Sequence, residues 1–168
     1  MKKIVIIGAG ISGLYIANLL RQNPNYEITV YEKNSSVNLK QGYGIQLSVN
    51  SIRLLNTIGF QGIKSEEKFH PNKLDFYSLE NKKKICDLDI SVFNTNEAKY
   101  TTLQRFTLIN FLKELLPNNL ITYNNKVTQI NYETENIKVI FENNTSIKCD
   151  YLILADGTFS KTKSLIAN

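Results

Sequence analysis

The chain has 168 residues, of which 42% are apolar and 21% charged, a composition typical of a folded globular protein. Its net charge of +5 comes from scattered lysines with no basic face interleaved with aromatic residues, so we expect no nucleic-acid binding. Two distant cysteines, a single histidine and the lack of any run of ~20 apolar residues predict no metal site, no disulfide framework and no stable membrane insertion, and they favour a cytoplasmic location.

The first 32 residues predict a βαβ unit. Residues 3–7 are apolar and rich in β-branched side chains, which is typical of a buried parallel strand. Apolar residues follow at helical spacing over 11–21, and Asn23-Pro24-Asn25 ends that helix. A second apolar strand over 26–31 closes with Glu32. Together these segments form a strand, a crossover helix and a second strand.

The remaining elements do not continue the βα alternation of an NAD-binding domain. In chain order we expect a glycine-punctuated loop at 41–45, a helix at 50–58, an antiparallel hairpin of 74–79 and 84–90, a helix at 102–116, a β-meander of 120–123, 126–132 and 137–142, a strand fragment at 147–149, and a buried strand at 151–155. The predicted fold class is therefore α/β. It combines a Rossmann-like parallel sheet with a β-meander and part of a second, antiparallel sheet.

The run from Gly8 to Gly13, which reads G-A-G-I-S-G, lies between the first strand and the helix. In such a fingerprint the first glycine permits a tight turn, the second lets a diphosphate approach the backbone, and the third lets the helix pack close to the sheet. Glu32 ends the second strand, where a carboxylate can accept hydrogen bonds from an adenosine ribose and disfavours a 2′-phosphate. A glycine-rich turn in an unrelated α/β protein is the alternative, which this complete strand, helix, strand and acid context disfavours.

Four stretches then follow one another in a specific order. They are residues 4–13, Gly42-Tyr43-Gly44-Ile45 with the helix after it, Leu103-Gln104-Arg105-Phe106-Thr107-Leu108, and 149–157, which ends in Ala155-Asp156-Gly157 and is followed by Ser160. In this combination the sequence resembles the FAD-dependent aromatic-ring hydroxylases, the family of p-hydroxybenzoate hydroxylase and the ubiquinone-pathway hydroxylases. The resemblance spans essentially the whole chain.

The resemblance implies the FAD-binding N-terminal part of a monooxygenase that hydroxylates an aromatic or similar electron-rich small molecule with NAD(P)H and O₂. It implies an FAD-binding domain over 1–168, into which 68–101 inserts a partial substrate-domain hairpin. The family's chain continues well beyond the Asp-Gly motif, so we expect the present chain to be incomplete for catalysis. Its possible polypeptide partners are then a separate C-terminal chain or a second copy of itself. The alternatives are a non-catalytic dinucleotide-binding remnant and the N-terminal part of another flavoprotein oxidoreductase, such as a reductase or halogenase.

The resemblance also implies cofactor contacts. Arg105 is similar to the family arginine that reaches the ribityl and phosphate region, the alternative being an exposed arginine at a helix start. Asp156 is similar to the family aspartate that contacts the ribityl chain or holds nearby backbone, and Gly157 would allow close approach; the alternative is an ordinary Asp-Gly turn after a strand. Lys161 and Lys163 stand where the family usually has an arginine, which weakens the assignment of NADPH. No catalytic acid or base can be named. The predicted cofactor-binding residues are Gly8, Gly10, Ile11, Ser12, Gly13, Glu32, Lys33, Gly44, Ile45, Arg105, Asp156 and Gly157. For Lys33 a solvated surface charge is the alternative, and for Gly44 and Ile45 it is a glycine turn with a core isoleucine.

Overall fold

The strands expected to form a parallel sheet do so in the computed structural model, which describes residues 1–37 and 43–166. The chain folds as two units. The first comprises Met1–Lys40 with Ile109–Asn168, and the second comprises Gln41–Leu108. Part of the loop expected at 41–45, including Gly42 of the second matching stretch, lies outside the described residues.

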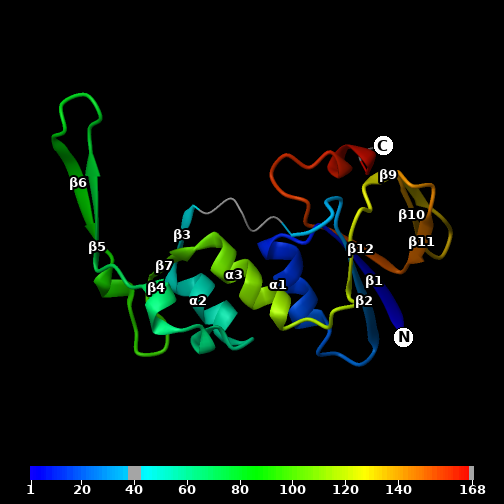
Figure 1. Ribbon diagram of the computed structural model, residues 1–168, viewed down its shortest axis with the longest axis horizontal. Coiled ribbons are helices and arrows are strands. Elements are labelled where there is room, and N and C mark those ends of the chain that lie inside the picture. Colours follow the sequence, from blue (N-terminus) through cyan, green and yellow to red (C-terminus); the bar gives the residue numbers. More distant parts are fainter. Residues whose placement is uncertain (38–42, 167–168) are drawn as a thin grey trace. The chain divides into compact units, whose positions relative to one another are not determined.

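The first unit is built on a four-stranded parallel sheet in the order β12-β1-β2-β8 (Figure 1). Its strands are β1 (Lys2–Ile7), β2 (Tyr26–Tyr31), β8 (Ile121–Thr122) and β12 (Tyr151–Leu154). The chain leaves β1 through α1 (Ile11–Leu20) to reach β2 on one side, and β12 later pairs with the other side of β1. The carboxyl end of β1 is therefore a topological switch point, where open α/β sheets bind their ligands.

Both faces of this sheet are covered, as its continuous apolar strands require. Val5 and Ile7 of β1 pack against the meander, whose strands are β9 (Val127–Tyr132), β10 (Ile137–Phe141) and β11 (Ser146–Cys149). Ile4 and Ile6 alternate with them and are buried on the opposite face. Helix α1 packs against β1 and β2 there and buries Leu14. Strand β1 is thus buried on both faces, and the glycine run begins at its carboxyl end.

The prediction that residues 120–123 begin the meander is wrong. β8 joins the edge of the parallel sheet, where Val30 pairs with Ile121. Its backbone bonds run from Val30 N–H to the Leu120 carbonyl and from Glu32 N–H to the Thr122 carbonyl, each at 2.9 Å. A segment this short has too little pattern to specify its sheet, so pairing with a distant strand decides the outcome.

The second unit contains a three-stranded antiparallel sheet in the order β3-β7-β4 and helix α2 (Val49–Asn56). The strands are β3 (Gly44–Leu47), β7 (Thr101–Gln104) and β4 (Lys68–Phe69). The predicted helix over 102–116 is therefore wrong at its start, because Thr101–Gln104 is the central strand of this sheet and α3 spans Arg105–Glu114. Two β-branched residues head β7, and pairing on both sides holds it extended.

A hairpin of β5 (Lys73–Tyr77) and β6 (Lys84–Asp89) confirms the predicted antiparallel pair, and Figure 1 shows it extending from the rest of the second unit. One face carries ion pairs, with Lys73 bound to Asp87 at 2.9 Å and Lys84 to Asp75 at 2.9 Å. The other face is apolar and consists of the cross-strand pairs Leu74–Leu88 and Phe76–Cys86. Among the described residues no helix is long and apolar enough to cross a membrane.

Candidate dinucleotide-binding site

The glycine run turns sharply out of β1 beside the end of β12. Gly8 has φ +104°, and a Cβ built on it would lie 2.6 Å from the Ala155 carbonyl oxygen. A Cβ on Gly13 would lie 2.0 Å from the Gly8 carbonyl oxygen. Both contacts involve backbone that cannot move aside like a side chain, so neither position accepts a larger residue without distortion. These two glycines make the turn and the close approach of helix to strand that the fingerprint requires.

Gly10 has a different environment, because a Cβ added there would meet no atom within 4 Å. It is the N-cap of α1 in an extended conformation, and no side chain of the described residues caps the helix. No acidic residue stands in the first turn, where Ile11 and Ser12 follow. The first amide N–H groups of a helix lack intrahelical partners and lie at the positive end of its dipole. The described residues therefore leave this helix start open to an anionic group such as a diphosphate.

Glu32 places its carboxylate against this loop from the end of β2. The residue is 8% exposed, and its Oε2 accepts a hydrogen bond from the Ala9 N–H at 2.9 Å. Its Oε1 accepts two more from Asn34, from the backbone N–H at 3.0 Å and from Nδ2 at 2.7 Å. Burial, with the charge of Glu32 as a smaller cause, raises the pKa of the neighbouring Tyr123 hydroxyl. A carboxylate has about four acceptor positions, and the donors of the described residues occupy three of those of Glu32.

Asp156 and Gly157 reach the same edge of the sheet from β12. The Ala155 N–H donates to the Ile7 carbonyl at 2.8 Å, and the Asp156 Cα lies 2.9 Å from the Cβ built on Gly8. The Asp156 carboxylate accepts a hydrogen bond from Ser160 Oγ at 2.8 Å, which fixes its orientation. Gly157 has φ +92° and open space around its Cα. The structure thus brings the glycine run, Glu32 and the Asp-Gly turn together at the switch point.

The other predicted site residues are described separately, because most of them belong to the second unit. Gly44 pairs with Gln104 and Ile45 with Leu103 in the β3–β7 ladder. The Arg105 N–H donates to the Tyr43 carbonyl at 3.0 Å, and its guanidinium lies 5.8 Å from the centre of the Tyr43 ring. Gly44, Ile45 and Arg105 therefore meet at one end of this ladder. Lys33, in the first unit, is exposed beside Glu32. The cofactor contacts of these four residues, like those of the other eight predicted site residues, stay predictions.

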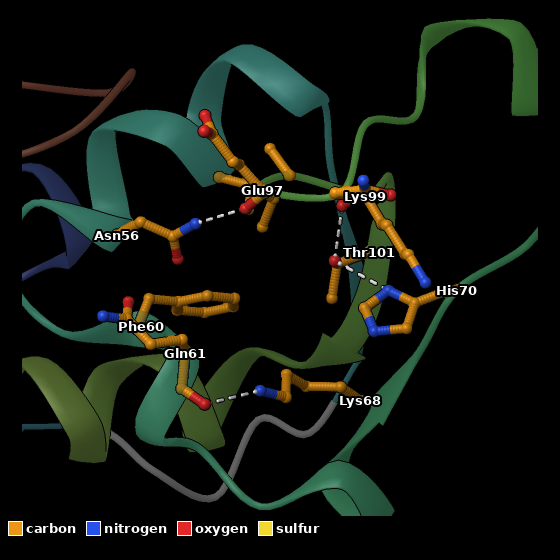
Figure 2. Close-up of a pocket in the computed structure, with 11 residues that line it drawn as sticks. Asn56, Phe60, Gln61, Lys68, His70, Glu97, Lys99 and Thr101 are labelled. Carbon is orange, nitrogen blue, oxygen red and sulfur yellow. Dashed lines mark hydrogen bonds between the residues drawn. The ribbon is translucent and has the colours of Figure 1, made fainter.

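The second unit also has a polar hollow of about 210 Å³ between α2, β4 and β7 (Figure 2). There the His70 Nδ1 lies 3.1 Å from Thr101 Oγ1 and 3.2 Å from the Tyr100 carbonyl oxygen. Thr101 Oγ1 also donates a hydrogen bond to the Lys99 carbonyl at 2.7 Å. The polar groups that line the hollow bond mainly to one another. The described residues hold no cluster of three or more metal-ligating side chains.

Asn34 and Ser160 are the polar residues whose roles the sequence did not indicate. Ser160 was part of a matching stretch, but nothing in the sequence connected it with the Asp156 carboxylate. Asn34 lies two residues after Glu32, a spacing at which asparagine and aspartate often form local turns. That spacing is a usable signal for a turn, but it does not say which side-chain atoms meet.

Comparison with known proteins agrees with this geometry. A family model described as an NAD(P)-binding Rossmann-like domain matches residues 6–39. The chain is 29% identical to 3-amino-4-hydroxybenzoate 2-monooxygenase PtnB3 of Streptomyces platensis, over 98% of this chain and 41% of that protein. It is 25% identical to 6-hydroxynicotinate 3-monooxygenase of Pseudomonas fluorescens, over 96% of this chain and 42% of that protein. The chain thus spans about two fifths of the length of these relatives.

Solved structures show the same fold. The 2,6-dihydroxypyridine-3-hydroxylase of Arthrobacter nicotinovorans superposes with a TM-score of 0.79 at 19% identity, over 99% of this chain and 40% of that one. The complex of Klebsiella pneumoniae HpxO with FAD and uric acid superposes with a TM-score of 0.76 at 21% identity, over 93% of this chain and 39% of that one. Over nearly its whole length, the chain is similar to the N-terminal part of the FAD-dependent aromatic hydroxylases and monooxygenases, which confirms the resemblance seen in the sequence.

Proposed function

We propose that this chain is the FAD-binding part of a flavin-dependent monooxygenase that hydroxylates a small aromatic or similarly electron-rich molecule with NAD(P)H and O₂. The observation that carries the proposal is the open start of α1 with the Glu32 carboxylate held beside it. An open helix start suits a diphosphate, and a neighbouring strand-end acid suits a ribose. The chain spans about two fifths of its relatives' length, and the full activity is part of the proposal.

The residues at the switch point fit FAD. Amides at Gly10 to Ser12 would hold the diphosphate, and Glu32 the adenosine ribose, while Asp156 and Gly157 would face the ribityl chain. In the second unit, Arg105, Gly44 and Ile45 stay predicted cofactor contacts, and a guanidinium such as that of Arg105 suits oxygen-rich groups. Lys33 would add charge near the dinucleotide. When bound, FAD supplies the redox chemistry with NAD(P)H and O₂, and the protein binds and orients it.

The printed names of the relatives point to the substrate class. They include enzymes for 3-amino-4-hydroxybenzoate, 6-hydroxynicotinate and salicylate, all small aromatic acids. We therefore propose a small aromatic substrate for this chain's assembly. Residues 68–101 would contribute a partial substrate-domain hairpin within an FAD-binding domain that covers 1–168.

The exposed apolar face of the β5–β6 hairpin supports a proposed polypeptide partner. Its apolar face is exposed, with Phe76 at 49% and Leu88 at 46%, and it is a two-stranded sheet with no third strand among the described residues. Two strands alone are at best marginally stable in water, and contiguous exposed apolar side chains mark interaction surfaces. We propose that this face packs against a polypeptide equivalent to the remaining part of the relatives, with self-association as the second candidate.

Titration of the purified chain with FAD tests the proposal. We expect the visible absorbance of bound flavin to stay with the protein through gel filtration. Adding a C-terminal fragment cut from one of the relatives should restore NAD(P)H oxidation that an aromatic acid stimulates. Flavin binding without such turnover would favour the non-catalytic alternative, and a chain that binds neither FAD nor ADP would refute the proposal.

A further inference from the structure

We propose that Asn34 is a positioning residue that holds the Glu32 carboxylate for the ribose of the bound nucleotide. This inference rests on the proposed function and goes one step further, because it identifies what orients the acid and which of its oxygens faces the ligand. Asn34 lies in the loop after β2, is exposed, and belongs to none of the predicted cofactor contacts.

The two carboxylate oxygens of Glu32 are held by different segments of the chain. Oε1 accepts from Asn34 twice, at 2.7 Å from Nδ2 and at 3.0 Å from the backbone N–H. Oε2 accepts from the Ala9 N–H, which belongs to the glycine run, at 2.9 Å. Rotation of the carboxylate about its terminal bond would break bonds to both oxygens. Its plane is therefore fixed relative to the start of α1 before any ligand binds.

The backbone around Asn34 is anchored independently of its side chain. The Asn34 carbonyl accepts a hydrogen bond from the Asn124 N–H at 3.1 Å, and the Glu32 carbonyl accepts one from the Asn125 N–H at 2.9 Å. Removing the Asn34 side chain leaves these bonds and the backbone bond to Oε1 in place. An effect of that removal on binding would thus report the Nδ2 bond itself.

Hydrogen-bond capacity assigns the ligand-facing oxygen. Each carboxylate oxygen has about two acceptor positions, so the two Asn34 donors saturate Oε1. Among the described residues Oε2 has one donor, the Ala9 N–H, which leaves one acceptor position on the oxygen that lies beside the glycine run. A ribose hydroxyl would donate to Oε2, and because the carboxylate is already oriented, binding would not need to restrict its rotation.

Two nucleotides that differ only in their ribose hydroxyls measure the contribution of the ribose–Glu32 hydrogen bond to binding. Adenosine 5′-diphosphate carries the ribose hydroxyls, and 2′,3′-dideoxyadenosine 5′-diphosphate lacks them but keeps the diphosphate. For the unsubstituted chain we expect ADP to bind about tenfold more tightly than the dideoxy nucleotide, as suits a hydrogen bond to a charged group. In N34A this ratio should fall to about threefold through weaker ADP binding alone, and in E32A it should approach unity.

Two further variants complete the test. N34D keeps the side-chain shape but has no donor, so it should lower the ratio at least as far as N34A. N131A removes an exposed asparagine of β9 in the same unit and should bind both nucleotides like the unsubstituted chain. A merely structural role of Asn34 would weaken both nucleotides equally and lower the unfolding temperature. Either that pattern or an unchanged ratio in N34A would overturn the inference, whereas an unsubstituted chain that binds neither nucleotide would overturn the proposed function itself.

Discussion

Alanine substitution of three glycines should separate folding from cofactor binding. A Cβ on Gly10 would enter open space, whereas a Cβ on Gly13 would lie 2.0 Å from a backbone oxygen. Gly62, in the second unit, also has open space and is the matched control. The three variants therefore add the same methyl group in three different surroundings.

The structure gives the expected magnitudes. G13A overpacks rigid backbone and should lose about 3 kcal/mol of unfolding free energy, which corresponds to roughly 6–12 °C in unfolding temperature for a chain of this size. Alanine is a poorer N-cap residue than glycine, so G10A should cost about 1 kcal/mol of unfolding free energy. Its methyl group, however, would occupy the space through which the diphosphate approaches the backbone. We expect its affinity for FAD to fall at least about tenfold, or about 1.4 kcal/mol.

Thermal unfolding without ligand and fluorescence titration with FAD measure the two quantities separately. G62A should match the unsubstituted chain in affinity and lie within about 1 kcal/mol of it in stability. The reasoning is refuted if folded G10A binds FAD as tightly as the unsubstituted chain, because the diphosphate would then lie elsewhere. A G13A variant as stable as G10A would show that the close approach of α1 to the turn is not needed.

Three further predictions concern cysteine reactivity, pH dependence and association. Burial, more than the charge of Asp150, raises the pKa of the Cys149 thiol to about 11, while Cys86 is exposed; the native chain should therefore react with one equivalent of a thiol reagent at neutral pH, and the denatured chain with two. Hydrogen bonds from Lys84 and then Lys73 lower the pKa of Asp87 to about 2. The stabilisation by this carboxylate should therefore be present above its unfolded pKa and disappear as the pH falls through about 2. An NMR titration of the Asp87 side chain would detect that transition. Replacing Leu88 by serine should leave the ion-paired face intact and reduce association measured by sedimentation, and unchanged association would place the contact elsewhere.

Much of the fold follows from local pattern. The β-branched run of β1 and the glycines after it specify a buried strand, a tight turn and a helix without long-range information. The same reasoning fails for Thr101–Gln104 and Ile121–Thr122, which are short and lie in segments whose propensity is weak or helical. β7 is held between β3 and β4, and β8 is held by β2. Such pairings join residues far apart in the sequence, so no local signal contains them.

The site shows the same division. Glu32 is predicted from its place at the end of the strand that follows the glycine run, whereas Asp156 is predicted from the resemblance of its Asp-Gly motif to that of a known family. Parallel pairing of β1 with β2 on one side and β12 on the other brings both acids to the glycine run. The sequence names these residues, but the order of the strands in the sheet is what places them together. The side chains that orient those acids, Asn34 and Ser160, follow from atomic contacts that no strand pattern encodes. If N34A retains the discrimination between ADP and its dideoxy analogue, the strand ends alone are sufficient for recognition, and the orienting contacts serve only the local turn.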